Sequence, residues 1–253
     1  MKTDVTAIIQ ARMGSSRLPG KVLMPLAGLP VIDRVIAQAQ YSSRISGIVV
    51  ATTTSPSDDP LVKHLQNRNI RFFRGSETDV LDRYYQCSKC IGANNIARIT
   101  ADCPLIDPQV IDQVIDLFDS SKVMYASNVE PATFPDGLDV EVFSFEALEW
   151  SWREAKLASE REHVTQYIRK HPELFSRGSL ESPTRLDHFR WTLDQEEDYQ
   201  LLNKIFNLLP STDAPVHYES VIKALARAPE TYELNGHIQR NEGLKKSLAE
   251  DLR

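Results

Sequence analysis

The loop that follows the first apolar run of the chain, residues 5–9, gathers side chains suited to binding phosphate. It holds three cations, two hydroxyls and two glycines, which are Arg12, Arg17, Lys21, Ser15, Ser16, Gly14 and Gly20. Guanidinium groups hold phosphate oxygens in pairs, and glycine lets backbone N–H groups come close to a ligand. A basic loop exposed to solvent is the alternative, but the chain is otherwise acidic and concentrates three cations here. The loop therefore predicts a site for a polyphosphate.

The spacing within this loop excludes two common nucleotide-binding motifs. A P-loop reads Gly-x-x-x-x-Gly-Lys-Ser/Thr, whereas five residues separate Gly14 from Gly20 and Val22 follows Lys21. The Gly-x-Gly-x-x-Gly pattern of dinucleotide-binding proteins is also absent from the loop. The phosphates are therefore expected to bind in a manner different from that of ATPases and dehydrogenases.

Two aspartates follow later strand-like runs and suit a divalent cation. Asp102 comes directly after the fourth such run, and Asp194 after a run in the second half of the chain. Carboxylates at two strand ends can hold Mg²⁺ and leave coordination positions for water and phosphate oxygens. The alternative is that both are helix N-caps, since a helical pattern follows each. Asp107 precedes Pro108 and is itself predicted to be an N-cap.

Further acids and one histidine could contact a hydroxyl-rich ligand. Asp136, Asp139 and Glu141 lie around a turn and a strand-like run, and carboxylates accept hydrogen bonds from sugar hydroxyls. A solvated hairpin is the alternative for this segment. Glu162 and His163 lie together on a helical pattern, where a histidine is as readily a packing or capping residue as a site residue.

Short β-rich runs alternate with helical patterns in the first half of the chain. The strand candidates are residues 5–10, 48–51, 70–73 and 96–100, and the helix candidates are residues 31–39, 61–66, 79–90 and 108–118. This alternation predicts a mostly parallel sheet covered on both faces, with the ligand beyond the carboxyl ends of the strands. The loops after Gln10 and Thr100 should therefore face one crevice.

The second half is less regular but continues the same domain. Strands are predicted at residues 139–143 and 188–193, and helices at residues 145–154, 161–169, 196–208 and 218–228. No linker, repeat or low-complexity segment divides the chain. We expect a single domain over residues 1–253. It comprises a nucleotide-binding half (1–125), a second half (126–210) that the family resemblance given below makes the acceptor-binding and dimerisation half, and a C-terminal helical extension (211–253) that packs on a partner subunit.

Composition limits the classes of function. The 253 residues are 42% apolar and 25% charged, as in ordinary globular proteins, and the net charge of −6 argues against a nucleic-acid partner. No apolar run approaches the ~20 residues that span a bilayer. The first apolar run is too short for a signal peptide, so we expect a cytoplasmic protein with no membrane partner. Three cysteines do not make a disulfide scaffold.

Five segments together resemble the cytidylyltransferases that activate acidic sugars. They read IIQARMGSSRLPGK at 8–21, FRGSETDVLDRYY at 73–85, RITADCPLIDP at 98–108, FPDGLDVEVF at 134–143 and SEREHVT at 159–165. The tail NGHIQRNEG at 235–243 is also similar to that of the branch of spore coat polysaccharide biosynthesis protein F. The family includes the CMP-KDO and CMP-acylneuraminate synthetases, and the resemblance covers nearly the whole chain.

The resemblance implies a Rossmann-like, three-layer α/β fold of the nucleotide-diphospho-sugar transferase type. It also implies residue roles. Arg12, Lys21 and Asp102 would be catalytic, and Asp102 and Asp194 would hold Mg²⁺. The nucleotide would contact Gln10, Ala11, Arg12, Gly14, Ser15, Ser16, Arg17, Lys21, Arg74, Gly75, Ser76 and Thr100. Within that set, residues 74–76 would lie against the base and ribose. The acceptor side would be Asp136, Asp139, Glu141, Glu162 and His163.

The activity implied is Mg²⁺-dependent transfer of CMP from CTP to an acidic sugar, with release of pyrophosphate, for surface polysaccharide synthesis by a homodimer. Such a transfer needs aligned reactants and stabilised charge rather than a covalent enzyme intermediate. The chain departs from the family pattern in three places: Ala101 replaces a glycine, Gln195-Glu196 replaces Thr-Pro, and Gln166 replaces a proline. A glycosyltransferase using nucleotide sugars and a nucleotide-binding module without catalysis remain the alternatives. The first usually carries Asp-x-Asp, which this chain lacks.

Overall fold

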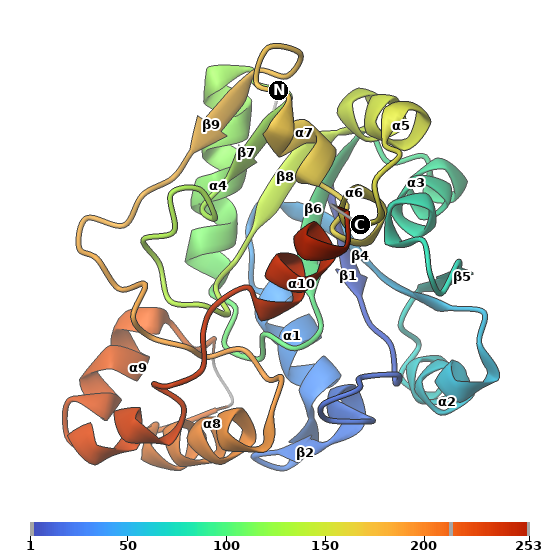
Figure 1. Cartoon of the computed structure of the whole chain (residues 1–253). Coiled ribbons are helices and arrows are strands. Elements are labelled where there is room, and N and C mark those ends of the chain that lie inside the picture. Colours follow the sequence, from blue (N-terminus) through green and yellow to red (C-terminus); the bar gives the residue numbers. More distant parts are fainter. Residues whose placement is uncertain (1–2, 213–214, 252–253) are drawn as a thin grey trace.

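The computed structural model describes residues 3–212 and 215–251, which build a seven-stranded sheet between layers of helices (Figure 1). The strand order is β5-β4-β1-β6-β8-β7-β9. Strands β5, β4, β1 and β6 run parallel, β8 is antiparallel to both its neighbours, and β9 is parallel to β7. The strands are β1 (Val5–Gln10), β4 (Ile45–Thr53), β5 (Phe72–Gly75), β6 (Asn95–Thr100), β7 (Tyr125–Ser127), β8 (Glu141–Ser144) and β9 (Arg177–Ser179). A separate small hairpin joins β2 (Pro25–Leu26) to β3 (Leu29–Pro30). The predicted α/β class with a mostly parallel sheet is confirmed.

Strand β1 is buried on both faces, which is why its sequence is almost continuously apolar. Successive side chains of a strand point to opposite faces. Accordingly Ala7 and Ile9 belong to one hydrophobic core and Ile8 to the other. The first core also holds the apolar faces of α1, α2, α4, α8 and α9, and the second those of α3, α5 and α7. Strand β1 is thereby packed against helices on both of its faces.

Local sequence signals set the helix ends in the first half. Asp79 caps α3 by accepting a hydrogen bond from the Asp82 N–H, and Gly92 ends that helix with φ of 68°. Asp107 caps α4 as predicted, accepting from the Gln109 N–H at 2.8 Å, with Pro108 in the first turn. The helices are α1 (Val31–Gln40), α2 (Asp59–Asn67), α3 (Val80–Ile91), α4 (Pro108–Ser121), α5 (Phe145–Glu154), α6 (Ala158–Glu162), α7 (Gln166–Lys170), α8 (Glu196–Leu208), α9 (Tyr218–Leu225) and α10 (Glu242–Glu250).

Two predictions in the second half are wrong. Residues 188–193 form no strand, and their only bridge joins Asp136 to Arg190. These residues pack against the tight turn at Gly137 rather than against a strand. The approach is so close that a Cβ on Gly137 would lie 2.7 Å from the Trp191 carbonyl carbon. The single helix predicted at 161–169 is instead the pair α6 and α7. It is interrupted at Val164, whose φ is 47°, a conformation that β-branched residues rarely adopt.

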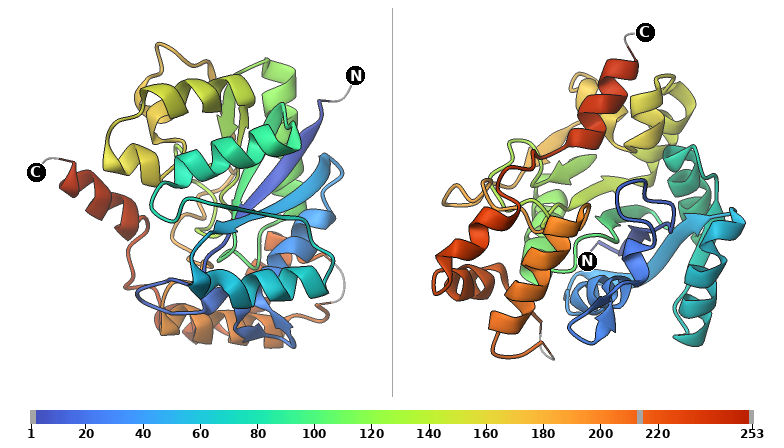
Figure 2. Two further views of the ribbon diagram at one scale, coloured as in Figure 1. Left: turned by 90° about the vertical axis from the view of Figure 1, so that its right-hand side faces the viewer. Right: turned by 60° about the horizontal axis from the view of Figure 1, so that its bottom comes forward.

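The C-terminal extension is helical and returns to the ends of the strands. After α8 and α9, a 3₁₀ segment at Pro229–Leu234 leads to α10, which packs against α6 of the same chain. Figure 2 shows this segment, in red, crossing from the α8–α9 end of the molecule toward α6. Its packing on a partner subunit stays a prediction. Within the described residues, no helix is long and apolar enough to cross a membrane.

Candidate active site

A cavity of about 610 Å³ opens beyond the carboxyl ends of β1 and β6, in the crevice predicted from the sequence. Twelve of the predicted site residues line it: Gln10, Ala11, Arg12, Ser15, Ser16, Arg17, Lys21, Thr100, Asp102, Glu162, His163 and Asp194. Ala101, where the family pattern has glycine, lines it as well. The loop after β1 thus shares one cavity with acids more than eighty residues away in the sequence.

Lys21 lies at the centre of this arrangement. Gly20 has φ of 73° and lets the chain turn into a short 3₁₀ helix that begins at Lys21. The lysine Nζ donates to Asp102 Oδ2 at 2.7 Å, to Asp194 Oδ1 at 2.7 Å and to the Leu193 carbonyl at 2.8 Å. The Leu193 N–H also donates to the Asp102 carbonyl, at 2.8 Å, which fixes the two aspartates side by side.

The cluster is charged at neutral pH. Burial alone would raise the pKa of Asp102, but the Lys21 ammonium and its hydrogen bond outweigh burial and lower this pKa to about 2. Burial likewise opposes the charge on Lys21, yet the two aspartates raise its pKa above the ordinary value. Lys21 thus offsets only part of the charge of the two carboxylates, and Asp194 also pairs with Arg17 and Arg190.

Neither aspartate is a helix N-cap, so that alternative is excluded for both. Helix α4 is capped by Asp107, and α8 begins after Gln195. Asp198, in the first turn of α8, accepts hydrogen bonds from the backbone N–H groups of Asp194 and Gln195. The Asp194 side chain is therefore free to face the cavity, where Oδ2 pairs with Arg17 at 2.9 Å.

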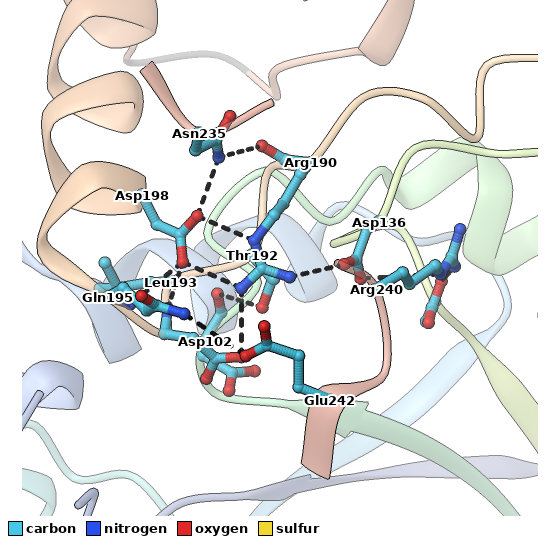
Figure 3. Close-up of polar contacts among 12 residues, drawn as sticks. Asp102, Asp136, Arg190, Thr192, Leu193, Gln195, Asp198, Asn235, Arg240 and Glu242 are labelled. Carbon is cyan, nitrogen blue, oxygen red and sulfur yellow. Dashed lines mark hydrogen bonds and ion pairs between the residues drawn. The ribbon is translucent and has the colours of Figure 1, made fainter. Parts of the chain in front are cut away.

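Arg190 holds the Asp194 carboxylate in place through an ion pair. Its guanidinium joins Asp194, Asp198 and Asp136, with Nε 2.9 Å from Asp198 Oδ1 and Nη1 3.0 Å from Asp136 Oδ2. Figure 3 shows Arg190 between Asp198 and Asp136, with Arg240 on the far side of Asp136. The sequence gives no signal for this role, because Arg190 lies in a segment with a strand-like pattern.

The carboxylates suit the predicted metal. Described residues include no group of three or more His, Cys, Asp or Glu side chains that could hold an ion. Mg²⁺, however, is commonly held by one or two carboxylates together with substrate phosphates. Asp102 and Asp194 already share one cation, the Lys21 ammonium, so their oxygens are close enough to share another. The donor set fits Mg²⁺.

On the acceptor side, only Glu162 and His163 line the cavity. Glu162 Oε2 lies 2.5 Å from Ser247 Oγ, and burial lowers the pKa of His163, which favours the neutral ring. Glu141 does not line the cavity; it pairs with Arg98 and accepts a hydrogen bond from Tyr125 Oη at 2.7 Å. Glu141 thus positions Arg98, which does line the cavity.

The structure does not bring Asp136 and Asp139 into the cavity. Asp136 pairs with Arg190 and Arg240, and Asp139 pairs with Arg240. Neither aspartate lines the cavity, and the ion pairs hold both carboxylates against Arg190 and Arg240. The alternative of a solvated hairpin is excluded as well, because ion pairs with Arg240 hold Asp136 and Asp139 against the C-terminal tail.

The structure also places residues 74–76 and Gly14 outside the cavity lining. The Arg74 Nε donates to the Thr53 carbonyl at 2.8 Å, and Nη2 pairs with Asp59 at 2.8 Å. Ser76 Oγ accepts from the Asp79 N–H. These contacts hold the loops around β5 and α3, so Arg74 is committed to the fold rather than to the cavity.

Arg83 also lines the cavity, although it was not predicted from the sequence as a site residue. It is 2% exposed, and its Nε and Nη1 have no hydrogen-bond partner among the described residues. Burial lowers its pKa, and Arg12 nearby adds to that effect. The sequence held one signal for Arg83: it is a cation on the otherwise apolar face of α3, beside Val80 and Tyr84. Such an unpaired buried charge is unfavourable unless a ligand supplies the acceptor.

Comparisons with known proteins identify the family of the chain. The cytidylyltransferase family model matches residues 6–242. Spore coat polysaccharide biosynthesis protein SpsF of Bacillus subtilis is 38% identical over 212 residues, 80% of this chain and 86% of that protein. A cytidylyltransferase structure from Leptospira borgpetersenii superposes with a TM-score of 0.85 at 30% identity, covering 91% of this chain and 97% of that one.

A structure of CMP:2-keto-3-deoxy-manno-octonic acid synthetase complexed with CTP shares the fold. Its TM-score is 0.63 at 16% identity, over 81% of this chain and 99% of that chain. The resemblance inferred from the five segments is confirmed by the family match, which spans nearly the whole chain. The chain belongs to the cytidylyltransferase family.

Proposed function

We propose that the protein transfers CMP from CTP to an acidic sugar in the synthesis of a surface polysaccharide. An oxygen of the sugar attacks the α-phosphorus of CTP. The bond from that phosphorus to the oxygen bridging to the β-phosphorus breaks, and pyrophosphate leaves. The observation that carries the proposal is the Lys21 ammonium held between Asp102 and Asp194 beside the phosphate loop, in a chain of this family.

The loop after β1 would bind the triphosphate. Arg12 is exposed at the cavity, and Arg17 reaches it from the other end of the loop, so the two guanidiniums can contact different phosphates. Ser15 and Ser16 add hydroxyl donors. Lys21 is the cation nearest the carboxylate pair and would stabilise charge that develops on the phosphate oxygens.

Asp102 and Asp194 would hold Mg²⁺. When bound there, the ion offsets the negative charge of the triphosphate, which the three loop cations neutralise only in part. On the protein side, the two carboxylates position Lys21, and Arg190 keeps Asp194 turned toward it. The relatives named for acidic sugars support an acidic acceptor, and Glu162 and His163 lie where its hydroxyls could be bound.

We further propose that the protein is a cytoplasmic homodimer. In each subunit, residues 1–125 would bind the nucleotide and residues 126–210 would bind the acceptor and form the dimer contact. Sedimentation of the purified chain at several concentrations tests the assembly. A mass that stays at 28.6 kDa throughout would contradict the dimer.

The decisive assay measures pyrophosphate release with each of the four nucleoside triphosphates, Mg²⁺ and a panel of acidic sugars. Wild type should release pyrophosphate with CTP and one of the sugars, and Asp102→Ala should lose turnover while keeping its far-ultraviolet circular dichroism. Consumption of a sugar nucleotide instead would favour the glycosyltransferase, and tight CTP binding without turnover the non-catalytic module. Near-wild-type rates for Asp102→Ala would contradict the role of Asp102.

A further inference from the structure

Helix α10 forms one wall of the cavity although nearly all of it lies beyond the family match. The match ends at Glu242, and α10 runs from Glu242 to Glu250. Figure 1 shows α10 beside α6 and in front of β1 and β6. Five of its residues line the cavity: Glu242, Gly243, Lys246, Ser247 and Glu250. Their spacing of three and four places them on one face of the helix.

The tail that carries α10 is anchored at several points. Asn235 is 3% exposed, and its Nδ2 donates to the Arg190 carbonyl at 3.0 Å and to Asp198 Oδ1 at 2.8 Å. Arg240 Nη1 donates to the Phe134 carbonyl at 3.0 Å. At the far end, Asp251 Oδ1 accepts from the Ser159 N–H of α6 at 3.0 Å. The helix is therefore held over the cavity at both ends.

Ser247 joins α10 to the acceptor side. It is 4% exposed, in a helix whose other residues are mostly exposed. Its Oγ lies 2.5 Å from Glu162 Oε2 and 3.1 Å from His163 Nε2. Since a hydroxyl has one hydrogen, Ser247 donates to Glu162 and accepts from His163. These three groups form a polar cluster at the cavity wall that can exchange hydrogen bonds with hydroxyls.

Lys246 adds a positive charge next to this cluster. It lines the cavity and makes no ion pair or hydrogen bond with any residue in 3–212 or 215–251. Two other cations of the cavity lining are already engaged: Arg17 pairs with Asp194 and Glu242, and Arg98 pairs with Glu141. Lys246 is therefore available for the negative charge of a ligand.

We propose that the acceptor sugar binds between α6 and α10, with Lys246 on its negatively charged group and Ser247, Glu162 and His163 on its hydroxyls. This inference rests on the proposed function and adds to it a specificity determinant outside the family's common part. A carboxylate and several hydroxyls on one small molecule are the chemistry that this wall matches, and an acidic sugar has both.

The test compares Lys246→Ala with Lys245→Ala in the pyrophosphate assay, using 3-deoxy-manno-octulosonate and N-acetylneuraminate as acidic probes with CTP. Lys245 is the matched control, because it is exposed on the same helix, does not line the cavity, and donates to Gln239 Oε1. Lys246→Ala should raise the KM of the sugar about tenfold, as expected for loss of a hydrogen bond to a charged group, and leave the KM of CTP unchanged. Ser247→Ala should raise the sugar KM as well, and Lys245→Ala neither.

The outcomes separate the two proposals. If wild type releases pyrophosphate and Lys246→Ala behaves as Lys245→Ala, the acceptor wall is wrong while the proposed function stands. An equal rise in both KM values for Lys246→Ala also overturns it, since α10 would then act on the nucleotide. If wild type releases no pyrophosphate with either probe or with the wider panel, the proposed function falls, and this inference falls with it. Thermal unfolding of each variant confirms that the fold is intact.

Discussion

Replacing Lys21 with methionine tests the arrangement on which the proposed site depends. Methionine keeps an unbranched apolar stem but removes the ammonium and its three hydrogen bonds, to Asp102, Asp194 and Leu193. Asp102 would then face Asp194 without the cation between them, while Asp194 keeps its ion pairs with Arg17 and Arg190. The substitution therefore removes a buried partner and leaves like charges close together.

The expected loss of stability is about 3 kcal/mol at neutral pH, the lower end of the range for breaking a buried ion pair by removing one partner. The lower end applies because the Lys21 side chain is 11% exposed and the two aspartate side chains 23% and 24% exposed. Turnover should also be lost, because Lys21 is the cation placed to stabilise charge on the phosphates.

The pH dependence gives an independent check. In wild type the pKa of Asp102 is about 2, below its ordinary value of 3.8, so its contribution to stability is present above pH 3.8 and is lost as the pH falls toward 2. Without the ammonium, burial raises the pKa of Asp102 above the ordinary value. The folded variant then takes up a proton at a higher pH than wild type. The stability difference between the two should shrink as the solution is acidified.

Urea unfolding of wild type and Lys21→Met at a series of pH values measures both effects. Lys63→Met on the exposed side of α2 is the control, because it removes one positive charge away from the cavity. The reasoning is refuted if Lys21→Met costs less than the control, or if its cost does not change between neutral and acidic pH.

Three further predictions follow from single contacts. Arg83→Gln should weaken CTP binding about tenfold by calorimetry, yet raise the unfolding temperature of the free protein, because it removes a buried charge whose Nε and Nη1 lack partners. Glu242→Gln should tighten CTP binding about threefold, since Arg17 loses one of two acids in a partly exposed pair; weaker binding would contradict this. Burial raises the pKa of Asp139 to about 7, although Arg240 opposes the shift. Between about pH 4 and 7 the folded protein therefore keeps a proton that the unfolded chain loses, and the stability contributed by this group falls as the pH rises. Asp139→Asn should flatten that slope in urea unfolding; an unchanged slope would exclude Asp139 as its source.

The sequence predicted the first half of the molecule well because its signals are local. An apolar run such as residues 5–9, a capping Asp79 and the Asp107-Pro108 pair depend on neighbours within a turn. The meeting of the phosphate loop with Asp102 could also be predicted, since parallel strands end at the same edge of a sheet. These inferences needed the chain order and the hydrophobic pattern, both of which the sequence contains.

The second half could not be predicted in the same way because its contacts join irregular segments. Residues 188–193 have the pattern of a strand, but they pack against the turn at Gly137, which no periodicity reveals. Arg83 is one of many arginines in the sequence, and only the folded chain shows that it is buried without a partner. Long-range polar contacts of this kind depend on side-chain geometry rather than on residue type.

Asp136 and Asp139, which were predicted to bind sugar, instead help to anchor the C-terminal tail that carries the motif at 235–243. Asp136 and Asp139 hold Arg240, and Arg190 presents its carbonyl to Asn235, so the residues around the β7–β8 connection anchor the segment that leads into α10. Arg190 also orients Asp194 toward Lys21. One buried arginine therefore connects the proposed metal ligands with the helix that covers the cavity. A motif that looks like a ligand site in the sequence can instead hold in place a segment that lines the site.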